Sequence, residues 1–109
     1  PIHSHISLYE YERVTHRMAP LIKAIQKFKA ENNRPPKDLS EIVPKYIERI
    51  PNTGIPAYRD LSYKISDKDV NGWGLSIAVD FDRFYYLSSQ NYPNHKDTEI
   101  INGWAFFHD

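Results

Sequence analysis

The chain has 109 residues, of which 40% are hydrophobic and 14% aromatic, and this predicts one folded domain with a single core. Fourteen basic side chains balance fourteen acidic ones, whereas nucleic-acid-binding proteins usually carry a basic surplus that neutralises phosphate. We therefore expect no nucleic-acid partner. The lack of cysteine excludes disulfides, a thiolate nucleophile and Cys-ligated zinc.

Residues 7–31 carry the pattern of a long amphipathic helix. Apolar side chains recur there at spacings of three and four, which places them on one face. At Pro20 we expect either a kink or a break, because proline lacks an N–H and its ring crowds the carbonyl four residues back. The helix should end at Asn32–Asn33, where Asn adopts the left-handed conformation and the two following prolines prevent continuation. The apolar face consists of Val14, Met18, Leu21, Ile22, Ile25 and Phe28.

A short second helix is predicted after the two prolines. Asp38 stands three residues before Glu41 and just ahead of apolar residues, which resembles a capping box with Asp in place of Ser or Thr. We expect this helix over residues 39–43 and a further turn over residues 44–47. Residues 50–58 are predicted to form a loop, since proline and glycine punctuate them.

In the second half of the chain the apolar period becomes two, as in half-buried strands. The alternation is clearest over residues 61–66 and 73–79. We predict a third strand over 83–89 and a fourth over 102–108, with a polar loop over 90–99 between them.

These elements imply one assembly, because an amphipathic helix and a one-sided sheet each need cover for an apolar face. The sequence therefore predicts an α+β fold, with a long N-terminal amphipathic helix packed on a C-terminal antiparallel β-sheet of three to four strands. We expect residues 1–109 to form a single domain in which residues 1–6 are a mobile leader.

Residues 24–58 resemble the region after the long helix in type IV pilin-like proteins, above all the major pseudopilins of type II secretion. In that family a helix runs into N-G-x-Y-P, then a capped L-x-x-L-V helix and a loop of the form P-x-x-G-x-P-x-Y. Asn32–Asn33 stand where Asn-Gly is usual. The other matching residues are Leu39, Ile42 and Val43 in the short helix and Pro51, Gly54, Pro56 and Tyr58 in the loop.

The resemblance implies a pilin-like fold and a periplasmic or otherwise extracytoplasmic domain. It also implies that an N-terminal anchor, absent from this chain, tethers the protein to the inner membrane. This anchor would be the protein's only contact with the membrane. We expect a structural or assembly component of a secretion- or pilus-type system that works through protein partners, self-assembly included. The alternative is a free periplasmic binding module, such as an inhibitor, immunity or adaptor protein.

Catalytic motifs are missing from the sequence. It contains no G-x-S-x-G, H-E-x-x-H, P-loop or G-x-G-x-x-G pattern. Asp80 and Asp82 flank Phe81, and such a pair beside a strand is more typical of a solvated turn than of two catalytic carboxylates. We therefore expect a protein that is not an enzyme.

The stretch "SDKDVNGWG" permits two interpretations. Asp67, Asp69, Asn71 and Gly72 match the opening of a calcium-binding loop, although the twelfth position, normally a bidentate glutamate, falls on Ala78. The other interpretation, which we favour, is a hairpin with Asn71–Gly72 as a type I′ turn, both residues at positive φ. We therefore expect no cofactor, and calcium bound at this loop is the alternative.

Adjacent aromatic residues suggest a contact surface. Tyr85 and Tyr86 must face opposite sides of a strand, as must Phe106 and Phe107, so one member of each pair can join the core. Exposed aromatics favour protein contacts, because they bury much area with few rotatable bonds. The alternative is that loops and the helix cover them. The contact candidates are Tyr85, Tyr86, Trp104 and Phe107.

Overall fold

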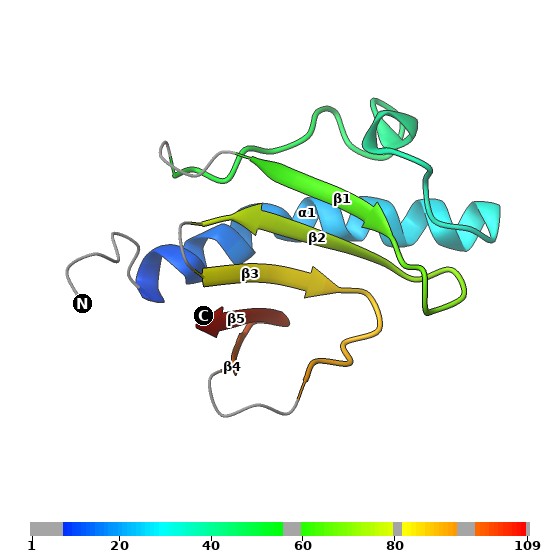
Figure 1. Ribbon diagram of the computed structural model, residues 1–109. Helices are drawn as coiled ribbons and strands as arrows, with labels where there is room; N and C mark the ends of the chain where they lie inside the picture. The colour runs from blue at the N-terminus through cyan, green and yellow to red at the C-terminus, as the bar shows by residue number, and fades with distance from the viewer. Residues whose placement is uncertain (1–7, 56–59, 80–81, 94–97, 109) are drawn as a thin grey trace.

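The computed structural model describes residues 8–55, 60–79, 82–93 and 98–108. One long α-helix lies across one face of an antiparallel five-stranded sheet (Figure 1), which confirms the predicted α+β class. None of the described helices is both long and apolar enough to span a membrane. In chain order the elements are α1 (Leu8–Asn32), the 3₁₀ helix η1 (Leu39–Ile42), β1 (Leu61–Ile65), β2 (Trp73–Ala78), β3 (Asp82–Leu87), β4 (Thr98–Ile101) and β5 (Trp104–His108).

Helix α1 runs for 25 residues and continues through Pro20, so the alternative of a break there is wrong. Pro20 is exposed, and the helix lacks the hydrogen bond that an N–H at this position would donate. At the C-terminal end Asn33 has φ 59°, and its N–H donates to the Lys29 carbonyl at 2.8 Å. This confirms the predicted left-handed cap. Of the predicted apolar face, Val14, Met18, Leu21, Ile25 and Phe28 are buried, and Ile22 is half-buried.

The segment from Asn33 to Asp60, called the linking segment below, joins α1 to β1. The predicted short helix is present as η1, and Asp38 caps it by accepting from the Ser40 N–H at 2.9 Å. The capping pattern differs from the expected box, since Glu41 reaches back to the Lys37 N–H, at 2.5 Å, rather than to that of Asp38.

A bidentate ion pair locks this cap. The Arg34 guanidinium donates to both Glu41 carboxylate oxygens at 3.1 Å. These bonds, followed by the one from the Lys37 N–H, lower the pKa of Glu41 to about 2. Tyr63 of β1 then donates to the Pro36 carbonyl at 2.5 Å, which ties the linking segment to the sheet.

The sheet has the strand order β1-β2-β3-β5-β4, with every neighbouring pair antiparallel. It has five strands rather than the predicted three to four, because residues 98–101 form β4. The sequence predicts a polar loop through residue 99 and no element at residues 100 and 101. Residues 102–108 are also not all strand. Ile101 pairs with Trp104, and the two residues between them have φ 48° and 88°, so Asn102–Gly103 forms the type I′ turn of a two-residue hairpin.

The core lies between α1 and the sheet and is rich in aromatic rings. Phe84 stacks on Trp104, with ring centroids 4.9 Å apart and an interplanar angle of 18°. From the first turns of the helix, Tyr11 contacts Phe84 at 4.7 Å and Phe106 at 4.4 Å, again between centroids. These contacts fix the helix across strands β3 and β5 and leave the opposite face of the sheet uncovered by α1.

Candidate functional site

The calcium candidates lie in the seven-residue connection between β1 and β2. Ser66 organises this loop: its Oγ accepts from the N–H groups of Lys68 and Asp69 at 3.1 and 3.0 Å. The Gly72 N–H donates to the Asp69 carbonyl at 3.0 Å, which closes a four-residue turn around Val70 and Asn71.

The predicted type I′ turn at Asn71–Gly72 is therefore wrong. Asn71 has φ 60°, but Gly72 lies outside the left-handed region. The reason is that β1 ends at Ile65 and β2 begins at Trp73, so the hairpin is too long for a two-residue turn. Gly72 is needed for space instead, because a Cβ there would lie 2.8 Å from the Cβ of Asp69.

The loop presents Asp67, Asp69 and Asn71 to solvent. Across the described residues, no group of three or more His, Cys, Asp or Glu side chains could hold a metal ion. Calcium takes six to eight oxygens, and two carboxylates with one amide are a sparse set for it. The calcium site stays a prediction. Asp80, which could have added a ligand, lies outside the described residues.

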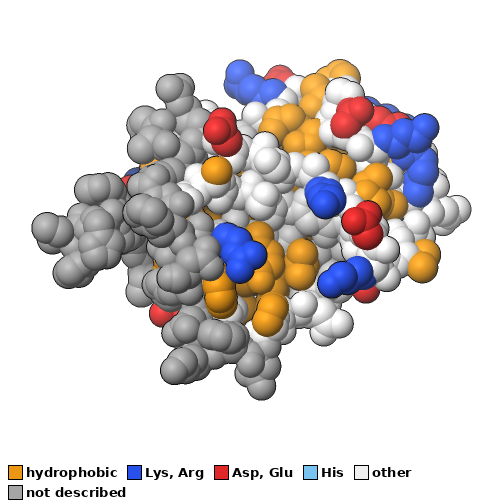
Figure 2. Space-filling view, viewed as in Figure 1, with side chains coloured by type: hydrophobic (Ala, Val, Ile, Leu, Met, Phe, Trp, Pro, Cys, Tyr) orange, Lys and Arg blue, Asp and Glu red, His pale blue; other side chains and the backbone are white. Residues whose placement is uncertain are grey.

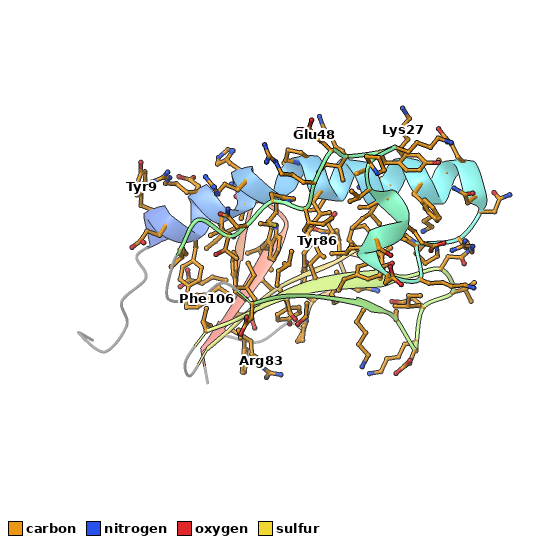
Figure 3. The ribbon with its side chains drawn as sticks, turned by 90° about the horizontal axis from the view of Figure 1, so that it is seen from above. Tyr9, Lys27, Glu48, Arg83, Tyr86 and Phe106 are labelled. Carbon is orange, nitrogen blue, oxygen red and sulfur yellow. The ribbon has the colours of Figure 1, made fainter. Side chains whose placement is uncertain are left out.

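The aromatic contact candidates divide between the two faces of the sheet. Trp104 is fully buried and Tyr86 is 9% exposed, so both belong to the core and not to a contact surface. They are directly opposite each other in the β3–β5 register and therefore share the face that α1 covers. Tyr85 and Phe107 are half-buried on the other face, which confirms the predicted alternation. Figure 3 shows Tyr86 and Phe106 beneath the helix and Arg83 on the far side of the sheet.

The uncovered face carries apolar side chains together with a cation, and we call this set the open-face patch (Arg83, Tyr85, Ile100 and Phe107). The Arg83 guanidinium lies over the Phe107 ring, 4.9 Å from its centroid. Ile100, on β4, is 53% exposed. Figure 2, which looks onto this face, shows apolar side chains next to basic ones. Arginine and aromatic side chains in one patch are typical of protein contact sites.

A second surface feature, which the sequence did not predict, is a groove along one flank of α1. It consists of two adjoining hollows of about 440 and 300 Å³ that share Gln26. We call it the helix-flank groove. Its lining residues are Gln26, Lys29, Ala30, Asn33, Asn71, Trp73 and Ser88 in the larger hollow and Thr15, His16, Ala19, Ile22, Lys23, Gln26, Tyr86, Asn102 and Trp104 in the smaller.

One end of the groove is held by a polar clamp. The Asn102 amide donates to the buried Thr15 hydroxyl at 2.9 Å, which fixes the β4–β5 turn against α1. Tyr92 holds the same turn from behind: its hydroxyl donates to the Gly103 carbonyl at 2.6 Å and accepts from the Leu87 N–H at 2.7 Å. Burial is the main cause that raises the pKa of Tyr92 to about 12. The sequence does not indicate this role, since "QNYP" has the composition of a polar loop.

Comparison with known proteins adds no relative. Neither a scan against protein-family models nor searches of curated proteins and of solved structures found a match to this chain.

Proposed function

We propose that this chain is a non-catalytic protein-interaction domain of the pseudopilin-like type, a structural or assembly component of a secretion- or pilus-type system outside the cytoplasm. In this proposal an N-terminal anchor tethers it to the inner membrane. The order of its elements supports the proposal, because one long helix comes first, a capped linking segment follows, and an antiparallel sheet comes last.

The observation that carries the proposal concerns the residues of the family resemblance. Ile42 is fully buried, and Leu39 and Val43 pack against the core, so the motif L-x-x-I-V seats the linking segment on the domain. Gly54, from the loop motif, has φ 82°, a conformation that glycine adopts without strain. Pro56 and Tyr58 of the loop motif lie outside the described residues, and the positions of Leu39, Ile42, Val43 and Gly54 are those of a structural motif.

The polar contacts of the linking segment support a structural role. Tyr46 donates to Glu31 at 2.7 Å, and Arg17 donates to the Asn52 side chain at 3.0 Å, so the segment is tied to both halves of α1. Because the apolar face of α1 packs against the sheet, a partner must contact other surfaces. The open-face patch is the surface best suited to it, because it combines Arg83 with aromatic rings.

Single cysteines in the full-length protein test the location and the contact together, since the 109-residue chain contains none of its own. Ile100→Cys probes the open-face patch, and Glu48→Cys, an exposed position on the linking segment, is the matched control (Figure 3). We expect a membrane-impermeant maleimide to label both variants once the outer membrane is permeabilised. We also expect a bifunctional maleimide to cross-link Ile100→Cys, but not Glu48→Cys, to another envelope protein or to a second copy.

Labelling that requires lysis of the inner membrane would refute an extracytoplasmic location. Equal cross-linking at the two positions would refute contact through the open-face patch. Labelling outside the cytoplasm, together with recovery of the protein in the soluble periplasmic fraction, would refute the membrane-anchored component and support the free periplasmic binding module.

A further inference from the structure

The helix-flank groove follows α1 for much of its length. Its helical residues are spaced as one flank of a helix, four or three apart, from Thr15 through Gln26 to Asn33. At a rise of 1.5 Å per residue this flank is roughly 27 Å long, which matches about eight residues of an extended peptide. A long, open groove of this kind suits an extended chain better than a compact small molecule.

Exposed amide side chains line the groove over buried aromatic rings. Tyr86 and Trp104 lie at the base of the smaller hollow and Trp73 at the base of the larger, and all three are buried. Gln26, Asn33 and Asn71 are exposed along the groove, whereas the Asn102 amide already donates to Thr15. Amide side chains both donate and accept hydrogen bonds, which matches the alternating N–H and C=O groups of a peptide backbone.

The charges of the groove have one sign. Lys23 and Lys29 line it, and no Asp or Glu is among its described lining residues. The chain as a whole is neutral, so this positive strip is a local feature. Along the helix axis Lys23 and Lys29 are separated by about 9 Å, close to the length of three residues in an extended peptide.

We propose that the helix-flank groove binds an extended, acidic peptide segment of a partner protein, with carboxylates about three residues apart paired to Lys23 and Lys29. Charge complementarity selects the segment, and the amide side chains hold its backbone. The inference rests on the proposed function to the extent that both assign the domain to protein contact, and it names a partner class for a surface separate from the open-face patch.

The test uses a fluorescein-labelled nonapeptide with glutamate at its second, fifth and eighth positions and serine elsewhere. Binding to the chain is measured by fluorescence anisotropy with the labelled peptide and, with an unlabelled one, by tryptophan emission, because both tryptophans lie beneath the groove. We expect saturable binding that weakens with added salt. Replacing the three glutamates by glutamine should weaken binding by more than tenfold.

Two charge-reversal variants locate the site. Lys23→Glu combined with Lys29→Glu should weaken binding by more than tenfold. Lys27→Glu, at an exposed lysine of the same helix that points away from the sheet (Figure 3), should change it by less than threefold. Lys23→Gln with Lys29→Gln provides a milder pair, and circular dichroism melts confirm that each variant is folded.

Absence of saturable binding up to millimolar peptide, or equal losses with Lys27→Glu and with the double variant, would overturn the proposal. So would concentration-dependent self-association in sedimentation that the double variant abolishes, since the occupant would then be a second copy. Failure of the peptide with success of the Ile100→Cys cross-link would leave the proposed function standing. Peptide binding without cross-linking of Ile100→Cys would support the groove and refute contact through the open-face patch.

Discussion

The chain contains two Asn-Gly dipeptides, and the structure uses them in opposite ways. At Asn102–Gly103 both residues have positive φ and form a two-residue hairpin between β4 and β5. At Asn71–Gly72 only the asparagine has positive φ, and the pair ends a seven-residue loop between β1 and β2. The same dipeptide is a turn centre in one place and the close of a longer loop in the other (Figure 1).

The difference shows that glycine can be required for two separate physical reasons. Gly103 has φ 88°, which is strained for a residue with a Cβ. Gly72 has an ordinary φ but is buried, and a Cβ would lie 2.8 Å from the Cβ of Asp69 and 3.1 Å from that of Ser66. One position thus selects glycine for its conformational freedom and the other for its small size.

The largest expected effects come from substituting the two glycines. Gly72→Ala should destabilise the fold by about 1–3 kcal/mol through overpacking, and Gly72→Asn, which is larger, by more. Gly103→Ala should cost about 1–2 kcal/mol for a left-handed residue with a Cβ, whereas Gly103→Asn should cost less, because asparagine tolerates that conformation. Urea denaturation of the four variants measures the free energies of unfolding. If alanine and asparagine ranked in the same order at both positions, the distinction between conformation and size would fail.

The two connections also differ in what holds them, and this predicts the next largest effect. Tyr92→Phe removes the donor to the Gly103 carbonyl and the acceptor of the Leu87 N–H, and we expect a loss of about 1–2 kcal/mol. Ser66→Ala removes the hydroxyl that accepts hydrogen bonds from the Lys68 and Asp69 N–H groups. Because this loop is more exposed, the loss of stability should be about 0.5–1 kcal/mol. Thermal melts at neutral pH compare the two variants. A larger loss for Ser66→Ala would show that the β1–β2 loop is the more tightly held.

Tyr92 adds a pH dependence to this prediction. Its pKa is raised from 10 to about 12 in the folded chain, mainly by burial. A group with a raised folded pKa stabilises the fold fully below its unfolded pKa, and that contribution is lost as the pH rises from 10 through 12. The difference in melting temperature between the parent chain and Tyr92→Phe should therefore be constant up to about pH 10 and narrow above it. A difference in melting temperature that widened above pH 10 would contradict a Tyr92 hydroxyl that is neutral and hydrogen-bonded in the folded chain.

The two turns also mark where sequence reasoning succeeds and where it stops. Period and caps are local, so α1, the Asn33 cap, η1 and the first three strands could be predicted. Strand β4 could not, because it has four residues, and the alternation within "TEII" is too short to separate from the polar loop before it. Without β4, the sequence could not indicate that Asn102–Gly103 rather than Asn71–Gly72 is the two-residue turn.

The candidate sites follow the same rule. Strand alternation predicted that Tyr85 and Tyr86 face opposite sides of the sheet, but it could not decide which of the two α1 covers. The same holds for Phe106 and Phe107. The helix-flank groove could not be predicted, because it combines one flank of α1 with residues near 71, 86 and 104. Which flank lines a groove depends on the rotation of the helix on the sheet, and the helical period alone does not specify that.

The two asparagines provide a finer comparison. Asn102→Gly keeps the turn conformation but loses the amide that donates to the Thr15 hydroxyl, so we expect a loss of about 0.5–1.5 kcal/mol. Asn71→Gly removes no side-chain bond recorded among the described residues, and the relief at φ 60° offsets the greater freedom of the unfolded chain, so the change should stay within about 0.5 kcal/mol. Equal losses in urea denaturation would mean that Asn71 also holds a partner with its side chain.

Calcium gives the smallest expected effect and tests the remaining interpretation of the β1–β2 loop. The loop is closed by Ser66 and by the turn around Val70 and Asn71, and the Asp67 and Asp69 side chains lie in solvent. Such a loop needs no ion to hold its shape, so millimolar calcium should leave the melting temperature and the amide spectrum of residues 67–72 unchanged. A calcium-dependent rise in melting temperature that Asp67→Asn and Asp69→Asn abolish, with magnesium as the control cation, would instead show that the loop binds an ion. The contrast between the two connections would then be one of ligand binding as well as of turn geometry.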